Sequence, residues 1–117
     1  MTSVSGVSTQ YLLNDDQVAD FVISGYHVVE PQFPAEFHAQ VYSELEALLT
    51  NPGDDINKAV PKIDEVYGHP VVAGALASLL GSDYTRAAHR HCHKNHPGTR
   101  SQAWHQDSLN IPTISEG

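Results

Sequence analysis

Residues 84–107, YTRAAHRHCHKNHPGTRSQAWHQD, decide the fold that we expect for this chain of 117 residues. From Tyr84 to His93 there is no Gly or Pro, and side-chain types alternate. Imidazoles fall on one side of that alternation, at His89, His91 and His93. A period of two predicts a β-strand. Pro97-Gly98 predicts a turn, and we expect a second strand through Gln102 and Trp104.

His105-Gln106-Asp107 directly follows this predicted hairpin. Residues two positions apart on a strand point to the same face, so the imidazole of His105 and the carboxylate of Asp107 can bind one divalent metal. They supply two thirds of the two-His, one-carboxylate triad that holds non-haem Fe(II). The alternative is a surface strand whose His and Asp side chains simply contact water, because a lone His-X-Asp pattern is common.

Charge is distributed unevenly along the chain, whose formal net charge is −8. Residues 1–83 contain 12 of the 14 acidic residues and only two cations, Lys58 and Lys62. Residues 84–106 contain no acid and four of the six cations. This segment indicates either a site for a metal or an anionic small molecule, or a solvated cationic strand face. Nucleic acid is disfavoured as a partner, because no extended basic patch with interleaved aromatic residues is present.

The first two thirds of the sequence predict helices. Asn14 is an N-cap with Gln17 three positions later, and Gly25 is a C-terminal stop. A short strand over 26–29 follows, and then a helix over 35–49 opened by Pro34. We also expect a helical turn around Val66 and a helix from Pro70 to Leu80, before Gly81.

Three features of the sequence indicate where in the cell the protein is expected: its N-terminal residues, its lack of a long apolar stretch and its single cysteine. Residues 1–12 lack a basic start and an apolar run, so we expect a short flexible tail and no secretory signal. No stretch is apolar and long enough to cross a bilayer, so no membrane contact is expected. The single Cys92 excludes an intrachain disulfide and suits a reducing cytoplasm.

The His-rich run at residues 89–96 offers a second interpretation. Cys and His are zinc ligands, so the chain could be a non-catalytic module that binds Zn(II) or Ni(II). The spacing matches no finger or knuckle, however, and alternate side chains on a strand lie about 7 Å apart. Some of these imidazoles would then line a cavity instead. Cys92 is expected to be a small buried apolar residue.

Four segments of the chain carry a family resemblance: residues 16–29, the stretch from His69 to Gly81, residues 89–98 and Trp104 to Ser108. Together they resemble the phytanoyl-CoA dioxygenase family. The resemblance implies a double-stranded β-helix, or jelly roll, with helices packed outside it. It also implies Fe(II) as the metal, 2-oxoglutarate as cosubstrate and hydroxylation of a small-molecule substrate.

By that resemblance His105 and Asp107 are the first two iron ligands, and His91, His93 and Gln102 line the cavity for cosubstrate and substrate. The presence of Asp107 favours hydroxylation over halogenation. The family's distal His ligand, and the Arg that pairs with 2-oxoglutarate, lie in later strands, and residues 108–117 contain neither His nor Arg.

The expected fold is therefore α+β, with N-terminal helices and the first strands of an incomplete jelly roll over residues 13–117. A jelly roll has eight strands, and about three can be counted here. We expect an N-terminal part of an oxygenase, inactive alone, completed by a second polypeptide or a C-terminal half. A third possibility is a degenerate relative kept as an interaction domain.

Overall fold

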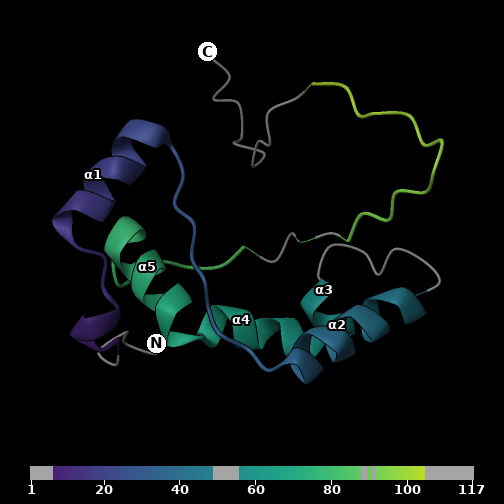
Figure 1. The fold of residues 1–117 in the computed structure, drawn as a ribbon, viewed down its shortest axis with the longest axis horizontal. Coiled ribbons are helices and arrows are strands. Elements are labelled where there is room, and N and C mark those ends of the chain that lie inside the picture. The colour runs from purple at the N-terminus through teal and green to yellow at the C-terminus, as the bar shows by residue number, and fades with distance from the viewer. Residues whose placement is uncertain (1–6, 49–55, 88–89, 91, 105–117) are drawn as a thin grey trace, which may run out of the picture.

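A computed structural model describes residues 7–48, 56–87, 90 and 92–104 (Figure 1). Its regular elements are helices, in two 3₁₀ turns and five α-helices. In chain order they are η1 Thr9–Tyr11, α1 Asp15–Ser24, α2 Ala35–Ala47, α3 Ile56–Ala59, η2 Pro61–Ile63, α4 Asp64–Gly68 and α5 Pro70–Leu80.

The ends of α1 confirm the predicted helix. The Asn14 Oδ1 atom accepts the Gln17 backbone N–H at 2.8 Å, and the Gln17 Oε1 atom accepts the Asn14 N–H at 2.9 Å. This reciprocal capping box satisfies two N–H groups that the helix itself leaves without partners. Gly25, at φ +82°, ends the helix in the left-handed region.

Local sequence also fixes α2 and α5. Pro34 precedes α2, as predicted, although the helix ends at Ala47, two residues before the expected end. Pro70 is the first residue of α5, where its missing N–H removes no hydrogen bond. The His69 Nδ1 atom accepts the Val71 N–H at 3.2 Å and so caps this helix. Gly81 follows its last residue, and both predicted ends of α5 are confirmed.

The hydrophobic core among the described residues is small. Val60, between α3 and η2, is fully buried, and four further apolar residues have exposed fractions of 8% or less: Phe37, Ile56, Val72 and Ala75. The Phe37 ring stacks on Phe33 at 4.1 Å between ring centroids. The buried residues therefore come from α2, α3 and α5 and from the link between α3 and η2.

The N-terminal turn η1 packs directly on α5. Gly74 is the point of contact, because a Cβ atom there would collide with the backbone carbonyl of Tyr11. Close by, the Leu13 N–H donates to the Ser78 Oγ at 2.9 Å, and this hydroxyl donates to the Gly74 carbonyl at 2.8 Å. These contacts anchor the start of α1 on α5.

The predicted jelly-roll strands are absent from the described residues, and the α+β expectation is wrong there. Neither 26–29 nor the described parts of 84–93 and 99–104 form strands; Arg90 alone forms an isolated bridge. A strand is stabilised by partners that pair with its backbone, which its own alternation cannot supply. The alternation of residues 89–94 is also between polar types, so it creates no apolar face to bury.

Residues 96–99 do form the predicted turn. The Thr99 N–H donates to the His96 carbonyl at 3.0 Å, and the Thr99 hydroxyl donates to the same carbonyl at 2.7 Å. Pro97 and Gly98 occupy the central positions, with Gly98 at φ +86°. Pro followed by a residue of positive φ is typical of a type II turn.

The helices of the described region are too short, or too polar, to cross a membrane.

Candidate functional site

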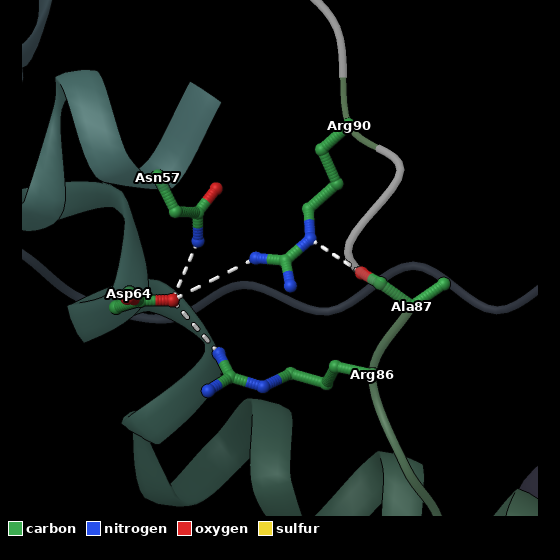
Figure 2. Close-up of polar contacts among 5 residues, drawn as sticks. All are labelled: Asn57, Asp64, Arg86, Ala87 and Arg90. Carbon is green, nitrogen blue, oxygen red and sulfur yellow. Dashed lines mark hydrogen bonds and ion pairs between the residues drawn. The ribbon is translucent and has the colours of Figure 1, made fainter. Parts of the chain in front are cut away.

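A polar cluster joins α3, α4 and the segment that follows α5 (Figure 2). At its centre is Asp64, the first residue of α4. The buried Asn57, on α3, donates its side-chain Nδ2–H to the Asp64 Oδ1 at 2.5 Å. The carboxylate is thus held in place by the neighbouring helix.

Two guanidinium groups approach the same carboxylate oxygen. The Arg86 Nη1 atom donates to the Asp64 Oδ1 at 2.9 Å, and the Arg90 Nη1 atom lies 3.8 Å from it. Both guanidinium groups also lie over the ring of Tyr67, at 5.1 and 5.7 Å from its centroid. Cation–π attraction and charge pairing therefore hold both arginines against α4.

The backbone around Arg90 is tied down as well. The Arg90 Nε–H donates to the Ala87 carbonyl at 2.8 Å, and the Arg90 carbonyl accepts the Ile56 N–H at 3.1 Å. This last bond supplies a partner for an N–H at the start of α3, where the helix has none.

The electrostatics of the cluster favour a charged Asp64. Its pKa is lowered from the ordinary value of 3.8, first by the Asn57 hydrogen bond and then by Arg86 and Arg90, against an opposing effect of desolvation. The side chains of Asp64 and Arg86 are about half exposed, at 48% and 43%. Water therefore screens the ion pair. The pair holds Arg86 in position against α4 but adds little to the stability of the fold.

Lys94 makes a second attachment, at the C-terminus of α2. Its Nζ atom donates to the Leu48 carbonyl at 2.8 Å and to the Glu46 carbonyl at 3.3 Å. A cation at this end of a helix satisfies carbonyls without intrahelical partners and complements the helix dipole. Arg86 and Arg90 on one side of Cys92, and Lys94 on the other, therefore anchor the segment that follows α5 to the helices.

The residues that the sequence singled out are only partly described. His93 and Gln102 are exposed. His91, His105 and Asp107 lie outside the described residues, so their predicted roles stay predictions. Cys92 is half-buried. Among residues 7–48, 56–87, 90 and 92–104, no three His, Cys, Asp or Glu side chains are grouped to hold a metal.

The Asp64 cluster was missed from the sequence. The cationic, acid-free composition of residues 84–106 was recognised, but its counter-ion lies 22 positions before Arg86. A clue was available in the charge balance, since 12 of the 14 acids that could pair with these cations lie in residues 1–83.

Comparisons with protein-family models, with curated proteins and with solved structures find no match for this chain. The functional interpretation therefore depends on its own residues.

Proposed function

We propose that this chain is part of a non-haem Fe(II)- and 2-oxoglutarate-dependent oxygenase that hydroxylates a small organic molecule. The observation that carries the proposal is the His105-Gln106-Asp107 pattern, placed directly after a cationic, His-rich segment that contains no acid. The resemblance to the phytanoyl-CoA dioxygenase family supports the same chemistry.

The donor set fits the metal. A neutral imidazole nitrogen from His105 and a carboxylate oxygen from Asp107 are two of the three ligands that bind Fe(II) while leaving positions open. When bound, Fe(II) supplies the centre at which O₂ and 2-oxoglutarate are consumed, yielding succinate, CO₂ and a hydroxylated substrate. By the resemblance, a distal His and a cosubstrate-binding Arg complete the site, and we assign neither to a residue of this chain.

The described residues support a role in presenting this pair. Arg86, Arg90 and Lys94 attach the preceding segment to α2, α3 and α4 through the contacts given above. His91, His93 and Gln102 are proposed to orient cosubstrate or substrate. Because residues 84–106 lack acid, no carboxylate there competes with Asp107 for the metal or repels an anionic cosubstrate.

Anaerobic Fe(II) titration by calorimetry tests the proposal. His105→Ala is expected to weaken Fe(II) binding by more than about tenfold, since even the loss of an outer-shell partner costs 10–100-fold in metal affinity. His91→Ala is expected to leave it nearly unchanged. His27→Ala, which removes an imidazole from the linker before α2, serves as the matched control.

The other interpretations give different results. Loss of binding in His91→Ala but not in His105→Ala would support a His-rich Zn(II) or Ni(II) module instead. Equal, unaltered titrations in all variants would indicate a degenerate relative that acts through interactions alone. Either pattern contradicts the oxygenase proposal.

A further inference from the structure

Residues 92–104, here called the arm, form an exposed cationic segment. Near its start Lys94 is bound to the C-terminus of α2, and in Figure 1 the rest of the arm runs away from the helices in light green to yellow. It carries Lys94 and Arg100 and no acid. All of its residues are exposed except the half-buried Cys92. Trp104, the only Trp in the chain, is fully exposed, with a relative accessibility of 104%.

A second exposed apolar region lies at the end of α1 and just after it, here called the N-terminal face. Large apolar side chains gather within residues 22–28, with exposed fractions from 67% to 82%: Val22, Ile23, Tyr26 and Val28. Exposed acids surround them in the sequence: Asp15, Asp16, Asp20 and Glu30. The exposed apolar residues are therefore flanked along the chain by exposed acids on both sides.

These two regions are complementary in charge and in chemistry. An exposed Trp and a group of exposed aliphatic and Tyr side chains are typical of surfaces that bind another protein. Lys94 is already bound to the C-terminus of α2, so Arg100 is the cation that the arm presents. Its charge is opposite to that of the acids beside the N-terminal face, and such opposite charges steer two surfaces together. Since one chain carries both halves, a second copy of it presents the matching surface for each.

We propose that two copies of this chain associate by reciprocal exchange, with the arm of each copy lying on the N-terminal face of the other. Trp104 packs among the apolar side chains of residues 22–28, and Arg100 lies against the acids of α1. Exchange of two identical arm–face pairs closes a dimer with twofold symmetry and leaves neither surface open. The inference is independent of the oxygenase proposal, because it uses no metal ligand.

Trp104 reports on the association directly, because no other Trp contributes to the emission. With increasing protein concentration, the Trp104 emission is expected to shift to shorter wavelength, in step with a change from monomer to dimer mass in sedimentation equilibrium. Raising NaCl to about 0.5 M is expected to weaken the dimer, since salt screens exposed charges.

One surface variant and a control test the N-terminal face. Ile23→Asp places a charge at a position that is 82% exposed, so the monomer fold is not disturbed. This variant is expected to raise the dimer dissociation constant by about tenfold or more, because an apolar side chain that the proposed dimer buries is replaced by a charge. Lys58→Glu, an exposed charge change outside both the arm and the face, is the matched control and is expected to have no such effect.

A mixing experiment assigns the contact to two different chains. The Ile23→Asp chain keeps its Trp104 arm, whereas a Trp104→Phe chain keeps its face and is silent in Trp emission. Adding excess Trp104→Phe chain to Ile23→Asp chain is expected to shift the Trp emission, although Ile23→Asp alone at the same concentration shows little shift.

Three results would overturn the proposal. One is Trp emission and molecular mass that do not depend on protein concentration, which is also the result expected if each arm folds back on its own chain. Another is an Ile23→Asp chain that dimerises as tightly as the unaltered one. The third is the absence of any shift on mixing.

Discussion

Gly74→Ala is a substitution for which local and tertiary effects have opposite signs. Gly74 is buried within α5, where Ala is normally the better helix former. A Cβ atom at this position would, however, collide with the backbone carbonyl of Tyr11 in η1. Because the obstacle is backbone rather than the end of a flexible side chain, it cannot be relieved by a rotamer change.

The two magnitudes decide the sign. Replacing Gly by Ala in a helix interior stabilises it by about 1 kcal/mol. Inserting a methyl group into a packed site costs about 1–3 kcal/mol. Moving η1 away from α5 would also break the hydrogen bond from the Leu13 N–H to the Ser78 Oγ, and this loss costs about 1 kcal/mol more. We therefore expect a net loss of about 1–3 kcal/mol in the free energy of unfolding.

Urea unfolding followed by far-ultraviolet circular dichroism measures this loss. Gly68→Ala is the matched control, because a Cβ atom at Gly68, the last residue of α4, meets nothing within 4 Å. It is expected to be neutral or slightly stabilising. If Gly74→Ala proves as stable as the unaltered chain or more so, the packing of η1 on α5 is refuted.

Three further predictions concern single contacts. Asn14→Ala removes the α1 capping box and is expected to cost about 1 kcal/mol in urea unfolding, so an unchanged midpoint would contradict the cap. Because the pKa of Asp64 is lowered below 3.8 in the folded chain, its contacts stabilise fully above about pH 3.8 and weaken as the pH falls through the lowered pKa. A carboxyl NMR titration checks this, and a midpoint at or above 3.8 would argue against the cluster. Lys94→Met should speed hydrogen exchange in the last turn of α2, corresponding to about 0.3–1 kcal/mol, whereas unaltered exchange would mean that Lys94 does not cap α2.

The helices were predictable because their determinants are local. The Asn14 and Gln17 cap, the Gly25 stop and Pro70 at the start of α5 each act within a few residues. Such short-range rules fix a helix end almost independently of the rest of the chain. The turn at Pro97-Gly98 was predictable for the same reason.

The strands were not predictable in this way, because pairing is non-local. The alternation through residues 89–94 was the same pattern that a strand would show, yet the Arg90 and Lys94 side chains there contact helices α4 and α2 instead. A strand needs a neighbouring backbone, and within the described residues Arg90 alone forms an isolated bridge. The Asp64 cluster escaped prediction for a related reason, since its members come from residues 57, 64, 86 and 90.

The candidate metal site was inferred from residue types, their spacing and the resemblance to a known family, and no contact in the described residues entered the inference. His105 and Asp107 carry the central claim, and Mn(II), a paramagnetic stand-in for Fe(II), can locate the bound ion directly. In ¹H–¹⁵N NMR spectra, substoichiometric Mn(II) is predicted to broaden the amide signals around residues 104–108 more strongly than those of residues 89–96. Broadening centred on 89–96, or spread evenly over the acidic residues 1–83, would contradict the assignment of His105 and Asp107 as metal ligands.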